Sequence, residues 1–213
     1  AKGLLFRSII RGGDKHLGGV TIPKITVVNL DDPAHDYYLK FWAEQHFGTT
    51  LTDHPGQTEV GDKLTVIAGK EVRLSKDSAQ FSVDGHHFSL PLPGDYNVRN
   101  ALQAIAVGRA LGVEWDVIQK GLATAHKIPG RAEEVPTGKP WRVVVDYAVT
   151  PSALAQFYSS LKQSGAARII GVFGATGGGR DAWKRPELGK IAAQYCAKII
   201  LTTEDPYYED PAA

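Results

Sequence analysis

The spacing of hydrophobic positions changes near residue 128, and the two parts of the chain predict different elements. In the first part, the β-branched run ITVVNL at 25–30 ends at a polar DDP sequence, which predicts a strand. Residues 35–45 carry aromatic side chains at helical spacing and predict a helix. Short alternating runs between 62 and 92, with Asp-Gly at 84–85, indicate a small antiparallel sheet that contains a hairpin.

Two helices and a linker are predicted next. Asn97 is a favourable N-cap for the first helix, an apolar stripe follows it, and Gly112 is placed to end it. The second helix covers 114–124. The segment KIPGRAEEVPTGKP is rich in Pro, Gly and charge, which is typical of an interdomain linker. We therefore predict one domain over 1–128 and a second over 129–213.

The second domain alternates strand and helix patterns. The strand-like runs RVVVDYA, ARIIGVFG and AKIILTT are separated by the helical runs PSALAQFYSSLKQ and KRPELGKIAAQYC. This order predicts an α/β fold with a parallel sheet and right-handed crossovers. Because ligands gather at the carboxyl ends of such strands, we expect Asp146, the glycines of 174–179 and the Glu204-Asp205 pair to lie at one sheet edge.

Composition and charge narrow the classes of function. The 24 basic and 23 acidic residues leave a formal charge of +1, so the positive field that nucleic-acid binding needs is absent. No apolar run approaches the roughly 20 residues of a membrane span, and no signal peptide is visible. The single cysteine, Cys196, excludes an internal disulfide and is interpreted as a small buried hydrophobe. We expect a cytoplasmic, monomeric protein with no nucleic-acid or membrane partner.

The densest chemical signal is GATGGGRD at 174–181, which follows a predicted strand and precedes a helix. It lacks the Lys-Ser/Thr that ends a P-loop and matches GxGxxG only loosely, but its backbone N–H groups and the helix N-terminus predict an anion site. Arg180 suits a carboxylate because its planar fork forms two parallel hydrogen bonds. Lys184 and Arg185 add positive charge; alternatively, both are solvated and Asp181 only caps the helix.

Three further residues are candidates for nucleotide binding. Asn97 and Asn100 lie three positions apart, and a carboxamide can donate to and accept from an adenine edge together, although Asn97 alternatively serves only as the cap. Asp146 ends VVVD, a pattern that holds magnesium in P-loop enzymes and is common elsewhere. The stretch GQTEVGDKLT misses the P-loop pattern at its Lys-Ser/Thr, so the sequence contains no P-loop. The histidines show no metal-ligand spacing.

A series of seven motifs resembles the Mur ligases: AKGLLF, NLDDP, LPGDYNVRNALQA, IPGRAEEV, VVVDYAVTPSAL, VFGATGGGRDAWKRPELGKIA and TTEDPYYEDP. The chain is most similar to the branch that adds the third amino acid to UDP-N-acetylmuramoyl-dipeptide in peptidoglycan synthesis. The resemblance implies the later part of the central ATPase domain, followed by the earlier part of a Rossmann-like C-terminal domain. The UDP-binding domain and the P-loop would then precede Ala1, and this piece alone should be inactive.

The resemblance also implies a reaction. ATP phosphorylates the substrate carboxylate, the incoming amino group attacks the acyl phosphate, and a tetrahedral intermediate collapses to an amide. The protein's part is to position the reactants and neutralise charge. ATP and Mg²⁺ are the implied cofactors, and the UDP-N-acetylmuramoyl-dipeptide and a free amino acid are the implied substrates.

Each motif also implies residue roles. Lys2, as a carbamate whose oxygens place Mg²⁺, and Arg131, which reaches the phosphates, are the implied catalytic residues. The adenine would meet Asn97 and Asn100, and the ribose side of the nucleotide would meet Asp146. For the incoming amino acid, the resemblance implies Arg180 at its carboxylate, Glu204, Asp205 and Tyr207 in the selectivity motif, and Lys184, Arg185 and Thr150 in support.

Two departures from the family pattern matter. The family's DYAHTP reads DYAVTP here, so Val149 replaces a histidine. The motif DNPR of enzymes that add meso-diaminopimelate reads EDPY at 204–207, so the distal carboxylate would lose its arginine partner at a cost of several kcal/mol. We therefore expect another third residue, such as lysine, whose ammonium Glu204 or Asp205 could meet; Tyr207 alternatively only packs.

Two other functions stay open from the sequence. One is a related ligase of the folylpolyglutamate or cyanophycin synthetase type, whose pterin or polymer site would lie outside this chain. The other is a nucleotide-binding module that has lost catalysis, which is consistent with Val149 and with the missing P-loop.

Overall fold

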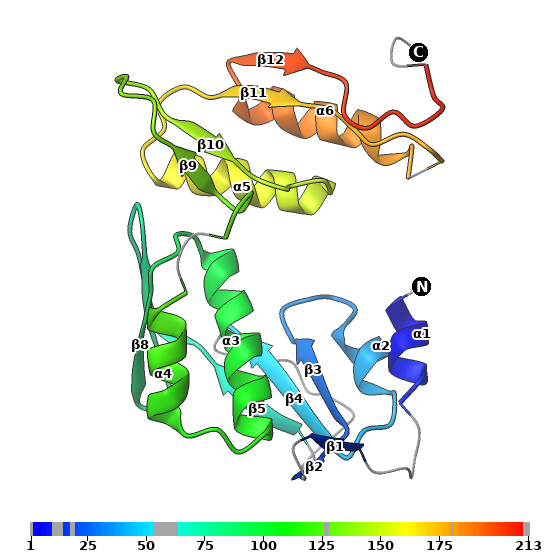
Figure 1. Cartoon of the computed structure of the whole chain (residues 1–213), viewed down its shortest axis with the longest axis vertical. Coiled ribbons are helices and arrows are strands. Elements are labelled where there is room, and N and C mark those ends of the chain that lie inside the picture. The colour runs from blue at the N-terminus through cyan, green and yellow to red at the C-terminus, as the bar shows by residue number, and fades with distance from the viewer. Residues whose placement is uncertain are drawn as a thin grey trace. The chain divides into compact units, whose positions relative to one another are not determined.

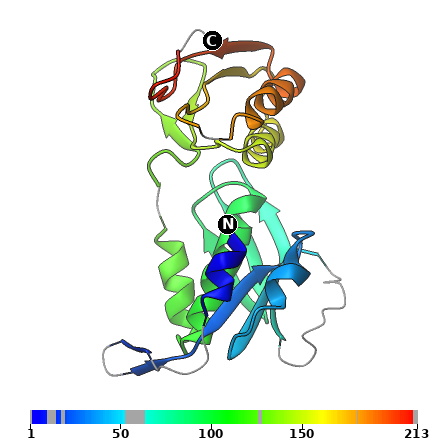
Figure 2. The same cartoon turned by 90° about the vertical axis from the view of Figure 1, so that its right-hand side faces the viewer.

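The computed structural model describes residues 2–9, 15–17, 20–52, 64–125, 128–179 and 181–210, with the backbone alone for residues 2, 15–17 and 20. The chain divides into two compact units, Ala1–His126 and Lys127–Ala213. Each unit combines helices with small β-sheets (Figures 1 and 2), which confirms the predicted α/β class. No helix within the described ranges is long and apolar enough to cross a membrane.

A three-stranded parallel sheet organises the first unit. Its order is β3-β4-β5, with β3 at Ile25–Asn29, β4 at Gln45–Thr50 and β5 at Leu64–Ala68. The helix α3 (Asp95–Ala110) packs along this sheet and buries Val98, Leu102 and Ile105 completely. Because burial of one such side chain contributes roughly 1.5–3 kcal/mol, the apolar stripe of α3 holds the helix on the sheet.

The central strand β4 is missing from the sequence prediction, which places a helix over 35–45. The helix α2 covers only His35–Leu39, and QHFGTT from residue 45 forms β4. Every residue of β4 except Gln45 is buried, including three polar ones. Two of them have partners inside the fold: His46 Nδ1 lies 2.9 Å from Thr26 Oγ1, and Thr50 Oγ1 donates to Asp31. A pattern based on hydrophobicity does not reveal a strand of this kind.

The predicted antiparallel sheet over 62–92 is correct only in its later part. Residues 64–68 form β5, which pairs in parallel with β4. The antiparallel sheet comprises β6 (Lys70–Leu74), β7 (Ala79–Val83) and β8 (His86–Leu90). The hairpin is confirmed: Asp84 and Gly85 have φ values of 48° and 78°, the positive values of a tight two-residue turn.

The boundaries of α3 differ from the prediction at one end. Gly94, with φ of 89°, is the N-cap, and Asn97 lies inside the first turn, where its side-chain amide donates to the Pro93 carbonyl at 2.8 Å. Asn97 is therefore not the cap. The other end is confirmed, because Gly112 has φ of 73° and its N–H donates to the Arg109 carbonyl, as in a Schellman ending.

The remaining elements of the first unit are short. The helix predicted over 114–124 is confirmed as α4, which packs on β8. Two strands, β1 and β2, form an antiparallel pair. The helix α1 opens the described part of the chain, where the sequence has helical periodicity. Their bounds are α1 (Lys2–Arg7), β1 (Lys15–Leu17), β2 (Val20–Ile22) and α4 (Trp115–Ala123).

The second unit contains the predicted alternation of helices and strands. The strand β11 (Ile170–Phe173) pairs in parallel with β12 (Lys198–Leu201), and α5 (Pro151–Gln163) packs against α6 (Lys184–Tyr195). Gly171 lies at a close contact in this layer, since a Cβ there would be 2.7 Å from Tyr158 Oη and 2.9 Å from Cys196 Sγ. Cys196 is half-buried and packs as a small side chain, close to the expectation.

The first strand of the second unit departs from the prediction. The strand β10 (Val143–Val145) pairs antiparallel with β9 (Glu133–Val135), which lies inside the segment predicted to be a linker. Among the described residues, the parallel pairing of this unit joins β11 and β12 only. The apolar run predicts a buried strand, but Val143 and Val145 are exposed. The run therefore specified neither the burial of β10 nor its partner strand.

Candidate functional site

The glycine loop at 174–179 packs directly against the segment that follows β12. The Gly177 N–H donates to the Asp205 carbonyl at 3.0 Å. A Cβ on Gly174 would be 2.4 Å from the Thr202 carbonyl oxygen, and one on Gly177 would be equally close to that of Pro206. Several of these glycines are therefore required by the approach of the chain's own backbone. The predicted proximity of the loop and the Glu204-Asp205 pair at one sheet edge is confirmed by these contacts.

Tyr207 contacts the same loop through its ring. Gly178 and Gly179 have φ of 73° and 75°, and a Cβ on Gly178 would be 2.8 Å from atoms of the Tyr207 ring. Tyr207 itself has φ of 54°, which is unusual for a non-glycine residue. The ring remains 58% exposed, so it covers the loop on one side and faces solvent on the other.

An ion pair joins the loop, α6 and the end of the turn. Arg185 Nη2 donates to Glu209 Oε2 at 2.5 Å, and the Gly179 N–H donates to Glu209 Oε1 at 3.2 Å. These two donors hold the pKa of the Glu209 carboxyl below its usual range. Arg185 is therefore paired within the chain, and the alternative that it is only a solvated charge is wrong.

Lys184 and Arg180 are the other basic residues that the sequence predicts at the loop. Lys184 is the first residue of α6 and is only 9% exposed, yet its ammonium makes no hydrogen bond or ion pair with a described residue. The helix has no side-chain cap, so Asp181 does not cap it; its carbonyl accepts the Lys184 N–H instead. Arg180 lies outside the described residues.

A pocket of about 210 Å³ opens between the glycine loop and the turn after β12. Its polar and charged lining residues are Arg185, Thr202, Thr203, Glu204 and Asp210. The pocket lies at the carboxyl ends of β11 and β12, where parallel sheets bind ligands. Its mixed charge suits a small zwitterion.

Two predicted nucleotide-side residues lie together near the start of β9. The Ala132 N–H donates to Asp146 Oδ2 at 2.7 Å, and the Arg131 guanidinium lies 4.8 Å from the centre of the Tyr147 ring. Burial raises the pKa of the Asp146 carboxyl, although the Ala132 N–H and the Arg131 charge oppose this shift. Asp146 follows β10, and β10 pairs with β9 rather than with β11 or β12. The strand pairing therefore does not place Asp146 at the edge of the β11–β12 sheet, where the sequence predicted it.

Thr150 has a clear local role. Its Oγ1 accepts the Ala153 N–H at 3.3 Å and caps α5, and Pro151 follows in the first position of the helix. The neighbouring Val149, which replaces the family histidine, uses its N–H to reach the Tyr147 carbonyl.

In the first unit, Asn97 and Asn100 lie in the first two turns of α3. Asn97 is half-buried and has given one amide hydrogen to Pro93, which leaves its second hydrogen and its carbonyl oxygen. Asn100 is exposed. Both carboxamides can therefore still accept and donate together, as an adenine edge requires.

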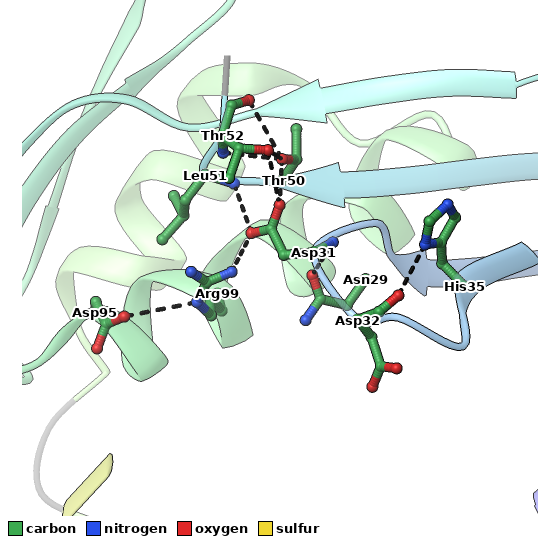
Figure 3. A network of polar contacts seen from close by, with 9 residues as sticks. All are labelled: Asn29, Asp31, Asp32, His35, Thr50, Leu51, Thr52, Asp95 and Arg99. Carbon is green, nitrogen blue, oxygen red and sulfur yellow. Dashed lines mark hydrogen bonds and ion pairs between the residues drawn. The ribbon is translucent and has the colours of Figure 1, made fainter. Parts of the chain in front are cut away.

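A polar network at the carboxyl ends of β3 and β4 was not among the predicted sites (Figure 3). The Asp31 carboxylate accepts from Thr50 Oγ1 at 2.6 Å, from the Leu51 N–H at 3.0 Å and from Thr52 Oγ1 at 3.1 Å, and Arg99 of α3 pairs with it. Burial opposes ionisation of Asp31, but these bonds outweigh it and lower its pKa. Only the Asp-Asp pair at the predicted strand end hinted at this site.

The helix α1, which begins at Lys2, packs against α2. A Cβ on Gly3 would be 2.3 Å from Tyr37 Oη, and the Phe6 ring lies 4.8 Å from that of Tyr38. The side chain of Lys2 lies outside the described residues. Within those residues, no group of three or more His, Cys, Asp or Glu could hold a metal ion. A magnesium ion that is bound mainly by phosphates and one carbamate does not need such a group.

Comparison with known proteins matches both units. The model of the Mur ligase middle domain matches residues 15–108, and that of the Mur ligase, glutamate ligase domain matches 130–213. The UDP-N-acetylmuramyl-tripeptide synthetase of Roseiflexus sp. (strain RS-1) is 36% identical over 197 residues, which cover 89% of this chain and 36% of the relative. The UDP-N-acetylmuramoyl-L-alanyl-D-glutamate--2,6-diaminopimelate ligase of Geobacillus kaustophilus (strain HTA426) is 32% identical over 215 residues, which cover 99% of this chain and 41% of the relative.

A solved structure has the same fold. The UDP-N-acetylmuramoylalanyl-D-glutamyl-2,6-diaminopimelate--D-alanyl-D-alanyl ligase of Acinetobacter baumannii superposes with a TM-score of 0.64 at 23% identity, over 96% of this chain and 42% of that chain. Together, the fold and the matched domains are those of ATP-dependent amide ligases as a class. The chain belongs to the Mur ligase family, and it spans about two fifths of the length of the curated relatives it matches.

Proposed function

We propose that this chain is the nucleotide-binding and amino-acid-binding part of a ligase that adds the third amino acid to UDP-N-acetylmuramoyl-L-alanyl-D-glutamate. The observation that carries the proposal is the pocket of about 210 Å³ between the glycine loop and the acidic turn after β12. The names of the relatives support the same reaction, because they describe synthesis of the tripeptide or addition of 2,6-diaminopimelate.

Four residues form the nucleotide side of the proposal. Asn97 and Asn100 would bind the adenine, since both retain free donors and acceptors. Arg131 would reach the phosphates; its guanidinium lies on the Tyr147 ring, which leaves the donors at its rim free for an anion. Asp146 would accept a hydroxyl of the ribose. Its raised pKa reflects a half-buried position that a bound sugar would complete.

Mg²⁺ would neutralise phosphate charge while the carboxylate of the substrate is phosphorylated. Lys2 is the proposed ligand, as a carbamate, because carbamylation converts a cation into a hard oxygen ligand of the kind that Mg²⁺ prefers. Its place at the start of α1 supports this role, since α1 packs on α2, which follows the polar loop at the carboxyl end of β3.

The incoming amino acid would bind at the glycine loop. Arg180 would bond its carboxylate, and Lys184, which is buried and has no described partner, would supply a second positive charge. Glu204 or Asp205 would meet an ammonium on the side chain. Tyr207 takes the place of the family's selectivity arginine, so we propose a third residue without a distal carboxylate, such as lysine.

The test uses the full-length parent protein with UDP-N-acetylmuramoyl-L-alanyl-D-glutamate, ATP and Mg²⁺. Phosphate release is followed with L-lysine, meso-diaminopimelate and other amino acids in turn. Release with lysine and not with diaminopimelate would support both the reaction and the selectivity. A preference for diaminopimelate would retain the reaction and exclude the selectivity, while silence with every amino acid would favour a different ligase or a non-catalytic module.

A further inference from the structure

We propose that Glu209 is a positioning residue of the amino-acid site, whose carboxylate fixes the turn bearing Glu204, Asp205 and Tyr207 on the glycine loop. The inference rests on the proposed function, because it concerns the site for the incoming amino acid. Glu209 is not among the predicted site residues. In the sequence it is distinguished only by its place in the second Glu-Asp-Pro of TTEDPYYEDP.

The geometry makes Glu209 the point where three segments meet. One carboxylate oxygen accepts from Arg185 of α6, and the other accepts from the N–H of Gly179 in the loop. The Glu209 N–H donates to the Pro206 carbonyl at 3.0 Å, which closes the turn between the two residues. The side chain therefore ties the far end of the turn to the loop and to α6.

The near end of the turn is tied separately by backbone. Gly177 donates to the Asp205 carbonyl, and Gly177 and Pro206 are in close contact. With both ends held, the Tyr207 ring is pressed onto Gly178 and Glu204 is kept in the pocket lining. If Glu209 were lost, the turn would lose its bonds to Arg185 and Gly179, and the groups that select the amino acid would be held less firmly in position.

The ion pair also controls where positive charge is available. Arg185 lines the pocket and would attract the carboxylate of an amino acid if it were unpaired. Glu209 neutralises it and uses the Gly179 N–H as well. The substrate carboxylate is thereby left to other positive groups, such as Lys184 at the start of α6. Loss of Glu209 would thus create a competing carboxylate site inside the pocket.

The experiment measures steady-state phosphate release by the full-length parent and its variants Glu209→Ala and Glu209→Gln. For Glu209→Ala, we expect KM for the amino acid to rise by roughly tenfold, the size that loss of a charge-assisted hydrogen bond gives, and discrimination between lysine and diaminopimelate to weaken. KM for ATP and for the UDP-linked substrate should stay unchanged. Glu209→Gln retains an acceptor for the Gly179 N–H. Its KM for the amino acid should lie between those of the unsubstituted parent and of Glu209→Ala.

Glu187→Gln is the matched control, because Glu187 lies in the same helix and forms an exposed 2.7 Å pair with Lys190 of that helix. It should change no kinetic constant. Thermal unfolding checks that each variant is folded. If Glu209→Ala is not folded, the KM and the discrimination of Glu209→Gln test the inference. An active parent whose Glu209 variants keep their KM and their discrimination would overturn this inference alone. A parent that is silent with every amino acid would overturn the proposed function, and this inference with it.

Discussion

The ring of Tyr207 lies on the backbone of Gly178, at a glycine whose φ is 73°. The two residues are 29 positions apart, and each has a positive φ. Under the proposed function, Tyr207 stands at the position for which the family resemblance implies an arginine in enzymes that add meso-diaminopimelate. Two consequences of this contact can be measured, together with three that concern other parts of the chain.

Gly178→Ala should destabilise the second unit. The positive φ costs a residue with a Cβ roughly 1–2 kcal/mol, and the new Cβ would stand 2.8 Å from the Tyr207 ring. Urea unfolding of the 213-residue chain measures the effect. Gly189→Ala is the control, because Gly189 lies inside α6 with nothing within 4 Å of an added Cβ. It should stabilise by up to about 1 kcal/mol, and equal effects of the two substitutions would contradict the structure.

Tyr207→Arg should shift selectivity towards meso-diaminopimelate. The guanidinium would supply a partner for the distal carboxylate of diaminopimelate. A carboxylate that lacks such a partner in a closed site costs several kcal/mol. The ratio of kcat/KM for diaminopimelate to that for lysine, measured in the full-length parent, should rise by at least about tenfold. Tyr208→Arg provides the matched control, since Tyr208 is the next residue and is 81% exposed. A similar rise in both variants would mean that charge alone, rather than position, is responsible.

Asp146→Asn should separate stability from activity. The folded state raises the pKa of Asp146, so the ionised carboxylate opposes folding at neutral pH, and this cost disappears as the pH falls through the folded pKa. Asparagine can still accept the Ala132 N–H. We therefore expect a Tm at pH 7 equal to or above that of the unsubstituted chain, a difference that vanishes in acid, and a large loss of ATP-dependent turnover in the parent. A lower Tm at pH 7 would contradict the cost of burying the carboxylate, and unchanged turnover in the parent would contradict the nucleotide role of Asp146.

Asp31→Asn should destabilise the first unit, with the opposite dependence on pH. The folded state lowers the pKa of Asp31, so its contribution is complete above the unfolded pKa of about 3.9 and is lost as the pH falls through the folded value. At pH 7 we expect a loss of roughly 1–3 kcal/mol, because Arg99 and several donors lose a charged partner. Unfolding measured between pH 7 and pH 3 should show the two curves converging. Asp116→Asn, which removes an exposed pair with Lys120, is the control and should have little effect.

Gly171→Ala should cost roughly 1–3 kcal/mol through overpacking. The added methyl would meet Tyr158 Oη at 2.7 Å and Cys196 Sγ at 2.9 Å, and both side chains are fixed by the core. In a Tyr158→Phe background, which removes the hydroxyl, the same substitution should cost less. The free energies of unfolding of the four variants form a double-mutant cycle. Additive costs would show that the hydroxyl is not what limits the space.

The order of elements could be predicted where hydrophobic period and turn chemistry agree. The hairpin at Asp84-Gly85, the end of α3 at Gly112, and α5 and α6 were all found in this way, because a positive φ and a helical stripe are local properties. The strand β4 was missed because its polar residues are buried against segments that are distant in sequence, and a hydrophobicity pattern does not reveal this. The pairing of β10 with β9 was missed for a related reason, since no local signal names the strand that lies alongside.

The candidate site divides in the same way. The amino-acid sequence alone determined the set of candidate residues, whose roles stay predictions: the glycine loop, the basic group around Arg180, the asparagines of α3 and the Arg131 and Asp146 pair. It did so because the residue types and their order are specific to one family. Tertiary structure alone decided that the turn after β12 packs on the glycine loop and that Arg185 pairs with Glu209. It also decided that Asp31 binds Arg99, which is 68 positions away in the chain. These are contacts between segments far apart in sequence, and only the folded backbone sets their distances.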